Sequence, residues 1–443
     1  MKIIISNTVT LNGGDFAILE SLINVLKKTY GEHIECKVYD SHANVASKYY
    51  PYINYRTSLY TKYSRKSLMK LGKRLTLLIN KFNKFSPLNR LMLAARLFSK
   101  KQNKIANLLL SKEERIDFNN YASADMIIST GGTYLVENYF LDPRFFDYYF
   151  TLALNKPLVF FTQSLGPFTN AANKEAIRKI FDRADLILLR DKASLDNLKD
   201  INVNVSKAKV CADVVFSETS FSVLEMAKYR KTETSLKVGI SVRDWKFFKG
   251  RSQKEGTEKY YNSVAAIVEY ITVKIGGEVV FVSTCQAIKE YHVDDSLTAK
   301  NIYALLSGEA KQRTSVNSDF HTTNQLKAIL KSFDIVISTR MHGAIQGLNV
   351  GVPVLPIAYE FKTKELFNKL INKAFILDID TIEEREAVNI FDQFLTYLPE
   401  FRASLFDKVI EEHVSALKPI QYLKEALNFP VNLFQALKEG VII

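Results

Sequence analysis

Short, uninterrupted apolar runs recur along the chain, each followed by a turn of small residues and then by an amphipathic stretch. In the first half the runs cover residues 2–6, 36–39, 126–129, 158–161 and 186–189. Continuous runs, in contrast to alternating ones, are typical of strands buried on both faces of a parallel sheet. After a polar stretch at residues 218–236, a candidate linker, the pattern restarts with predicted strands at 237–242, 278–282, 334–338 and 354–357.

Between these strands, residues 16–28, 263–274 and 324–331 place their apolar side chains on one helical face. The alternation predicts an α/β fold of two tandem Rossmann-like, doubly wound domains that face a cleft, a GT-B-like architecture. We expect an N-terminal domain at residues 1–217, which contains a basic helical insert at about 41–112. A second domain at 237–395 and a helical tail at 396–443 complete the prediction.

The composition fits a two-domain globular protein. The chain has 443 residues, of which 47% are hydrophobic and 24% charged. Its three cysteines, Cys36, Cys211 and Cys285, are far apart, which favours a reducing compartment and argues against a disulfide framework or a cysteine-rich zinc site. The N-terminal apolar run is too short for a signal peptide, and no run is long enough to span a bilayer. We therefore expect a cytoplasmic protein.

The net charge of +13 is concentrated in one segment. Residues 41–112 contain no Asp or Glu but 16 Lys and Arg, so the rest of the chain is slightly acidic. Residues 60–110 have helical spacing with basic side chains, among them Lys66, Lys70, Lys73, Arg74 and Lys81. The basic face could be merely solvated, or it could attract the anionic inner face of the cell membrane or an acidic, lipid-linked acceptor. Nucleic acid is not expected, because no recognised nucleic-acid motif is present.

The sequence Thr339-Arg340-Met341-His342-Gly343 lies at the exit of a predicted strand and opens a helix. Open α/β sheets bind their ligands at this position. An anion there would gain from the helix dipole and from charge-assisted bonds to Arg340. Arg243 leaves another predicted strand at the same edge, so both arginines could face one ligand. The alternative is that Arg340 pairs with a neighbouring acid and that His342 is a buried, hydrogen-bonded residue.

Several motifs together resemble the polysaccharide pyruvyl transferase family over nearly the whole chain. They are Asn12–Ile18, Gly131-Gly132, Gln163–Pro167, Arg190-Asp191 with Ser194, Ala212–Phe216, Ser241–Arg243, Ser338–Gly343, and Ala358-Tyr359 followed by Lys362. The resemblance implies transfer of the pyruvyl group of phosphoenolpyruvate to a sugar, with a pyruvate ketal and phosphate as products. The basic insert and the C-terminal tail depart from the family pattern.

The resemblance also implies that the domain at 1–217 is the acceptor side and the domain at 237–395 the donor side, and it implies roles for particular residues. The donor would be held by Arg243, Arg340, Met341, Gly343 and Lys362, with His342 as general acid and the two arginines assisting catalysis. The acceptor, a sugar of a cell-surface polysaccharide or its lipid-linked precursor, would contact Asn12, Gly14, Asp15, Gly131, Gly132 and Gln163.

Neither a cofactor nor a metal is expected. No His or carboxylate cluster has ligand spacing, and His292, Asp294 and Asp295 are interpreted as a solvated loop.

Two other functions remain open. A nucleotide-sugar glycosyltransferase would share the architecture, but Glu360 is the nearest acid after the predicted strand at 354–357 and no paired-glutamate spacing precedes it. A catalytically silent scaffold for glycan assembly, docked on the membrane through the basic segment, would have no chemical need for Arg243, Arg340 and His342.

Overall fold

The computed structural model describes residues 1–64, 86–231 and 235–427. They form two compact units, which do not follow the sequence in simple order. Unit 1 comprises Met1–Thr10, Ile18–Val214 and the chain from Ala416 onward, and unit 2 comprises Leu11–Ala17 and Val215–Ser415. The chain therefore leaves unit 1 briefly at residues 11–17 and returns to it at residue 416.

Unit 1 is built on an eight-stranded parallel sheet with the order β3-β2-β1-β4-β6-β7-β8, and β5 pairs with β6 beside this path. The strands are β1 (Lys2–Thr8), β2 (Glu35–Asp40), β3 (Tyr55–Thr57), β4 (Met126–Ser129), β5 (Gly132–Leu135), β6 (Leu158–Leu165), β7 (Leu186–Leu189) and β8 (Ala208–Val210). Every residue of β4, β6 and β7 is buried, as expected for strands covered on both faces.

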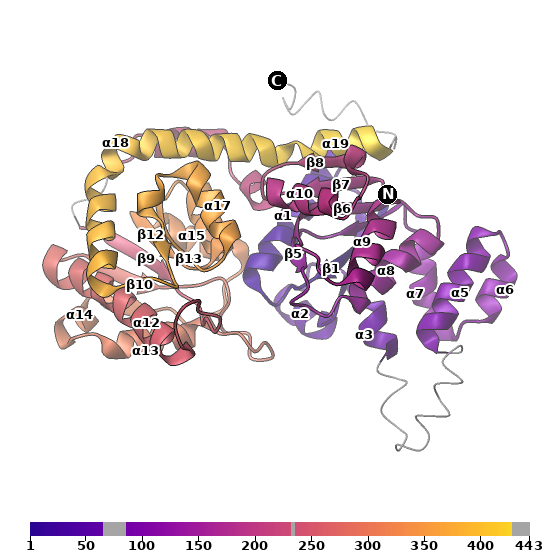
Figure 1. The fold of residues 1–443 in the computed structure, drawn as a ribbon, viewed down its shortest axis with the longest axis horizontal. Helices are drawn as coiled ribbons and strands as arrows, with labels where there is room; N and C mark the ends of the chain where they lie inside the picture. The colour runs from indigo at the N-terminus through magenta and orange to yellow at the C-terminus, as the bar shows by residue number, and fades with distance from the viewer. Residues whose placement is uncertain (65–85, 232–234, 428–443) are drawn as a thin grey trace, which may run out of the picture. The chain divides into compact units, whose positions relative to one another are not determined.

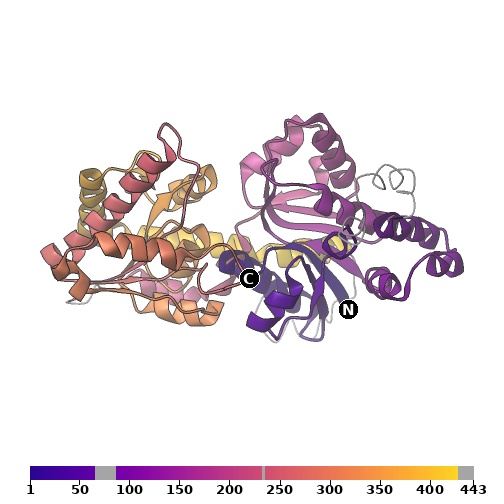
Figure 2. The same ribbon diagram turned by 90° about the horizontal axis from the view of Figure 1, so that it is seen from below.

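Helices cover both faces of this sheet (Figures 1 and 2). The helices of unit 1 are α1 (Gly13–Tyr30), α2 (Ala43–Tyr49), α3 (Leu59–Ser64), α5 (Pro87–Ser99), α6 (Asn103–Leu108), α7 (Lys112–Ala122), α8 (Asp142–Ala153), α9 (Ala171–Phe181), α10 (Lys192–Asp200) and α19 (Pro419–Leu427). Two apolar cores result, one centred on Phe160 and Phe181, the other on Tyr121 and Phe150.

The described part of the acid-free segment packs into the core of unit 1. Its basic side chains pair with acids on α7, the helix that follows it in the sequence. Leu59, Tyr63 and Leu91 are buried in the core that contains Phe118 and Tyr121. The Nζ of Lys62 lies 2.7 Å from a carboxylate oxygen of Asp117, and Arg90 pairs with Glu114; both acids are on α7. The predicted basic helix around Lys66, Lys70, Lys73, Arg74 and Lys81 lies outside the described residues.

Unit 2 contains a six-stranded parallel sheet with the order β11-β10-β9-β12-β13-β14. The strands are β9 (Lys237–Ser241), β10 (Glu278–Phe281), β11 (Thr314–Val316), β12 (Ile335–Ser338), β13 (Val354–Ala358) and β14 (Leu377–Asp378). In sequence order this is the 3-2-1-4-5-6 arrangement of a Rossmann fold, and unit 1 repeats it on its path from β3 to β7. The helices are α11 (Phe221–Ala227), α12 (Gln253–Glu269), α13 (Asp295–Leu305), α14 (Gly308–Gln312), α15 (Thr323–Lys331), α16 (Met341–Asn349), α17 (Phe361–Leu370) and α18 (Glu384–Leu417).

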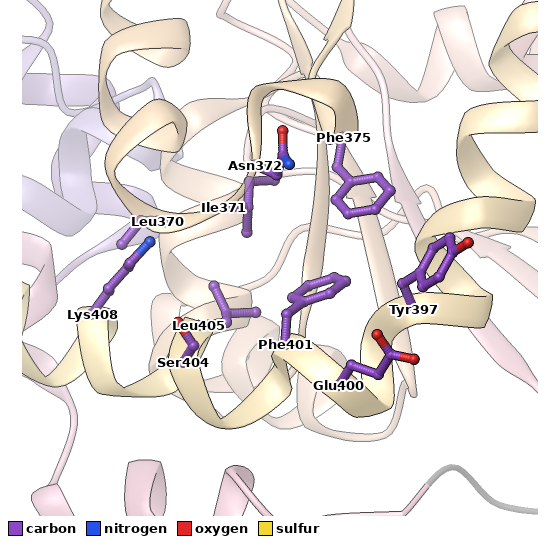
Figure 3. Close-up of a pocket in the computed structure, with 10 residues that line it drawn as sticks. All are labelled: Leu370, Ile371, Asn372, Phe375, Tyr397, Glu400, Phe401, Ser404, Leu405 and Lys408. Atoms are coloured by element: carbon purple, nitrogen blue, oxygen red, sulfur yellow. The ribbon is translucent and has the colours of Figure 1, made fainter.

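Helix α18 bends sharply in Figure 1 and carries Pro399 in its interior. A proline ring removes one amide from the helical hydrogen-bond ladder and kinks the helix. A cavity of about 520 Å³ lies against this part of α18, with Phe375 and Phe401 stacked at 5.3 Å between their ring centroids (Figure 3). None of the site residues predicted from the sequence lines it. No helix in the described parts of the chain is both long and apolar enough to cross a membrane.

Most predicted strands coincide with observed ones, but five observed strands were not predicted. They are β3, β5, β8, β11 and β14, which have two to four residues. The expected linker at residues 218–236 is not simply a connection, because it contains α11, whose Leu224 and Ala227 are buried. The many polar residues of this stretch gave no apolar periodicity from which such a short helix could be predicted.

Candidate functional site

The carboxyl ends of β9 and β12 form the point where the strand order of unit 2 reverses, which is the usual ligand site of such sheets. The register pairs Ser241 with Ser338, so the residues that follow leave the sheet side by side. Arg243 follows β9, and Arg340 follows β12 as the N-cap residue of α16. The structure therefore places both predicted arginines at one edge of one sheet.

Helix α16 begins directly after Arg340, and the side chain of Arg340 makes no capping hydrogen bond to it. The first amide N–H groups of a helix lack partners within it and carry a partial positive charge, which favours an anion. Met341 and Gly343 are buried in this first turn, and His342 is partly buried between them. Met341, His342 and Gly343 thus lie in the first turn of a helix whose N-terminal field favours an anion.

A buried carboxylate holds Arg340. Sequence analysis offered pairing with an acid only as the alternative to ligand binding. Its Nε and Nη2 donate to the two carboxylate oxygens of Asp295 at 2.8 and 2.6 Å. Asp295 is 1% exposed and also accepts a hydrogen bond from Ser283 Oγ at 2.6 Å. Burial alone would lower the pKa of Arg340, but the charge of Asp295 outweighs it and raises that pKa well above the usual value.

The interpretation of residues 292–295 as a solvated loop was therefore wrong for Asp295. Asp294 caps α13 through the amide of Ser296, and the next residue turns inward beneath Arg340. The backbone N–H of Asp295 donates to the carbonyl of Cys285 at 2.7 Å, which fixes its position behind β10. Asp295 is a positioning residue that sequence reasoning missed, and the N-cap signal of Asp294 was the available clue.

Arg243 has a different environment. Its guanidinium lies over the ring of Tyr359 at 4.2 Å and near Trp245 at 5.2 Å. Its Nε donates only to the adjacent carbonyl of Asp244, at 3.3 Å, and no carboxylate pairs with it within the described residues. Because Asp295 neutralises Arg340 and no described carboxylate neutralises Arg243, Arg243 has the greater capacity for an external anion at this edge.

Residues 11–17 connect to this edge of unit 2. Asn12 Oδ1 accepts the amide of Gly14 at 3.0 Å and the thiol of Cys285 at 3.1 Å, and thereby caps α1. A Cβ on Gly14 would lie 2.9 Å from Nδ1 of His342. Sequence analysis assigned Asn12, Gly14 and Asp15 to the acceptor side of an N-terminal domain, whereas the structure groups residues 11–17 with unit 2 and places Gly14 beside His342.

Gly13→Ala tests how closely this loop must approach β10. An alanine Cβ would lie 2.1 Å from the backbone carbonyl oxygen of Thr284, so the loop or the strand end must move. We expect the free energy of unfolding to fall by about 1–3 kcal/mol, the usual cost of overpacking. Denaturant unfolding measures it, with Gly308→Ala as the control, because a Cβ there meets nothing within 4 Å. Equal stability of the two variants would contradict the close approach.

Lys362 lies in the first turn of α17, and its Nζ is 2.7 Å from a carboxylate oxygen of Glu360. Both residues follow β13, the strand next to β12. The structure thus brings Lys362 to the same edge as the two arginines, already paired with an acid.

Gly131, Gly132 and Gln163, the other predicted acceptor residues, belong to unit 1. Gly132 has a φ of +131°, and its missing side chain leaves room for the ring of Tyr134, 2.4 Å from where a Cβ would be. Gln163 is fully buried and its Nε2 donates to Ser129 Oγ at 3.3 Å and to the Thr130 carbonyl. These residues shape the carboxyl ends of β4 and β6.

Two further motif segments meet in unit 1. Arg190 donates to Asp213 Oδ2 at 2.6 Å, to Ser164 Oγ at 2.7 Å and to Thr133 Oγ1 at 2.6 Å. Asp191 accepts the amide of Ser194 at 2.7 Å and caps α10. Because the charges are buried and paired with each other, this cluster fixes the strand ends of unit 1. No group of three His, Cys, Asp or Glu side chains arranged to hold a metal occurs in the described residues.

Comparison with known proteins agrees with the motifs. A family model described as polysaccharide pyruvyl transferase matches residues 12–360. The amylovoran biosynthesis protein AmsJ of Erwinia amylovora is 24% identical over 297 residues, which cover 66% of this chain and 70% of that protein. The family predicted from the sequence is confirmed.

Solved structures with the same fold include sugar-nucleotide enzymes. UDP-GlcNAc 2-epimerase from Neisseria meningitidis, bound to UDP-GlcNAc, has 12% identity and a TM-score of 0.55, with 96% of this chain and all of that chain covered. Anabaena Alr3699/HepE in complex with UDP has 14% identity and a TM-score of 0.54, with coverages of 97% and 100%. At such identities the likeness concerns the fold alone, and it confirms the predicted α/β, GT-B-like class.

Proposed function

We propose that this transferase, a chain that belongs to the polysaccharide pyruvyl transferase family, takes phosphoenolpyruvate as its donor and forms a pyruvate ketal on a sugar. The acceptor would be a sugar of an exopolysaccharide or of its lipid-linked precursor. The name of the relative AmsJ, a biosynthesis protein for amylovoran, supports a polysaccharide pathway. The reaction would need no cofactor and no metal.

The guanidinium of Arg243, which pairs with no carboxylate among the described residues, carries this proposal. Phosphoenolpyruvate bears a carboxylate and a phosphate, and planar guanidinium groups recognise both bidentately. Arg243 would hold one anionic group, and the amides at the start of α16 would hold the other. Arg340, oriented by Asp295, would present its remaining N–H groups to the same ligand.

His342 would act as the general acid. It would deliver a proton to the methylene carbon of phosphoenolpyruvate, which creates an oxocarbenium-like centre that one sugar hydroxyl attacks. Breakage of the bond to phosphate regenerates such a centre for a second hydroxyl, which closes the ketal. Of the two hydroxyl protons released, one balances the proton added to carbon and the other leaves with phosphate. General acid catalysis typically contributes about 10²–10⁴-fold.

Arg243→Ala tests the donor assignment. We expect phosphoenolpyruvate at about 100 times its dissociation constant to stabilise the wild type by roughly 2.7 kcal/mol and the variant far less. Thermal shift measures this, with UDP, GDP and CMP as competing ligands. Arg313→Ala is a matched control, because Arg313 is exposed and donates only to the carbonyl of Gly276 among the described residues. A shift with a nucleotide in place of phosphoenolpyruvate would indicate a glycosyltransferase.

The chain's single tryptophan offers a second readout. Trp245 lies 4.7 Å from Tyr359 between ring centroids and beside Arg243. A ligand that engages Arg243 should therefore change the fluorescence of Trp245. This signal reports donor binding without requiring an acceptor.

A cytoplasmic location, peripheral at the inner face of the membrane, remains part of the proposal. All three cysteines are free thiols, which supports a reducing compartment. Attraction of the segment 60–110 to an anionic membrane surface stays a prediction, because much of that segment lies outside the described residues.

A further inference from the structure

A strained residue lies at the point where the strand order of unit 1 reverses. Asn7 near the end of β1 has a φ of +61°, a conformation that non-glycine residues rarely adopt. β1 is paired with β4 there, so Asn7 is at the position where a doubly wound sheet accepts ligands. Backbone strain persists where the surrounding contacts enforce it, and it clusters at functional sites.

The side chain of Asn7 is fixed on both sides. Its Nδ2 donates to Ser129 Oγ at 3.2 Å and to Tyr148 OH at 3.1 Å, and these two hydroxyls are 2.8 Å apart. Its Oδ1 accepts from Nε of Arg144 at 2.6 Å. These bonds fix the orientation of the Asn7 side-chain amide, and in that orientation its Oδ1 positions the guanidinium of Arg144.

Arg144 carries an uncompensated charge. No carboxylate pairs with it among the described residues, and its Nη2 donates no hydrogen bond there. It belongs to the first turn of α8, where the helix dipole opposes a cation. Its guanidinium lies 5.7 Å from the ring centroids of both Tyr134 and Tyr139. A positioned cation in an unfavourable field, with unused donors, is the arrangement expected of an anion-binding group.

Aromatic surface adjoins this cation. Tyr139 is 53% exposed and Phe140 is 64% exposed, and the carbonyl of Phe140 accepts from Nη1 of Arg144 at 3.2 Å. An exposed tyrosine ring offers an apolar face and a hydroxyl, which suits the apolar face and hydroxyl rim of a sugar ring. A small inorganic anion would gain nothing from such a face.

We infer that Asn7, Arg144 and Tyr139 form a binding subsite in unit 1 for a sugar that carries a carboxylate or phosphate group. Arg144 binds the anionic group, Asn7 orients Arg144, and Tyr139 stacks on the sugar ring. As the acceptor subsite, it rests on the proposed function and would select glycans with an acidic sugar or a sugar phosphate. As a binding site it stands on its own, because none of its residues belongs to the donor edge of unit 2.

Binding of defined probes to the full chain tests the subsite. The probes are a glucuronic-acid-containing disaccharide, glucose 1-phosphate, neutral maltose and inorganic phosphate, measured by calorimetry on the wild type, Arg144→Ala and Tyr139→Ala. We expect at least one anionic sugar to bind about tenfold or more weakly to each variant, equivalent to about 1.4 kcal/mol. Arg178→Ala is the control, because Arg178 is an exposed arginine of unit 1 that is already paired with Glu175.

The outcomes separate this inference from the donor proposal. Preference for the uronate or for glucose 1-phosphate identifies the source of the anionic group, and either result supports the subsite. Equal affinity of wild type and both variants, or equal binding of maltose or inorganic phosphate, overturns it. Tyr139 is largely exposed, so that variant stays informative even if Arg144→Ala perturbs folding. Arg243→Ala should leave this binding unchanged even if the donor proposal fails.

Discussion

Replacing His342 by alanine is expected to reduce turnover by about 10²–10⁴-fold while phosphoenolpyruvate still binds. The side chain lies in the first turn of α16 and against Gly14, so its removal leaves the helix amides, Arg243 and Arg340 in place. The loss should therefore appear in kcat, measured by phosphate release. The donor affinity, measured by Trp245 fluorescence, should change little.

His292→Ala is the matched control for this variant. His292 is exposed, its ring contacts that of Tyr291 at 4.8 Å between centroids, and no described hydrogen bond joins it to Arg243, Arg340 or His342. Its replacement should leave both turnover and donor affinity unchanged. Normal turnover in His342→Ala would remove His342 from the role of general acid, whereas a loss of donor affinity with intact kcat would make it a binding residue.

Arg340→Ala is expected to lower the free energy of unfolding by about 3–5 kcal/mol, because it leaves the carboxylate of Asp295 buried without its cation. Chemical denaturation followed by Trp245 fluorescence reports this on unit 2. Arg243→Ala should cost much less, because Arg243 neutralises no described acid. A loss of donor binding in Arg340→Ala must therefore be interpreted together with its stability.

The double variant Arg340→Leu/Asp295→Leu separates the two effects. Removing both charges together should recover much of the stability lost in the single variant, because no buried charge remains unpaired. Donor binding should remain weakened, since the leucine side chain has no N–H group to donate. Full stability of the single Arg340→Ala variant would contradict the buried ion pair.

The strands that could be predicted are those in which consecutive residues are buried. β4 and β7 were predicted to the residue, because each is a short run of apolar side chains covered on both faces. β8 and β11 lie at sheet edges, have three residues each and are only partly buried. Such strands form because a neighbour offers hydrogen bonds, which no local pattern records.

The arrangement of the candidate site was predictable where it depends on position along one strand and not where it depends on distant partners. Arg243, Arg340 and His342 follow from the rule that strand ends of a parallel sheet share one edge. The partner of Arg340 is 45 residues away, and Arg144 is 137 residues from Asn7. Neither pairing leaves a signal in a single sequence, because any of many carboxylates or amides could have filled the role.

The interleaved order of the two units has a consequence for biogenesis. Helix α19 completes unit 1, where Lys209 lies over the ring of Tyr422 and Tyr30 OH donates to the carbonyl of Leu423 at 3.3 Å. A ribosome makes residues 419–427 only after all of unit 2, so unit 2 is synthesised in full before the last described helix of unit 1. A truncated fragment that stops at Val214 would therefore present an uncovered surface beside β7. A fusion that joins residues 416–427 to Val214 through a short linker would restore the cover.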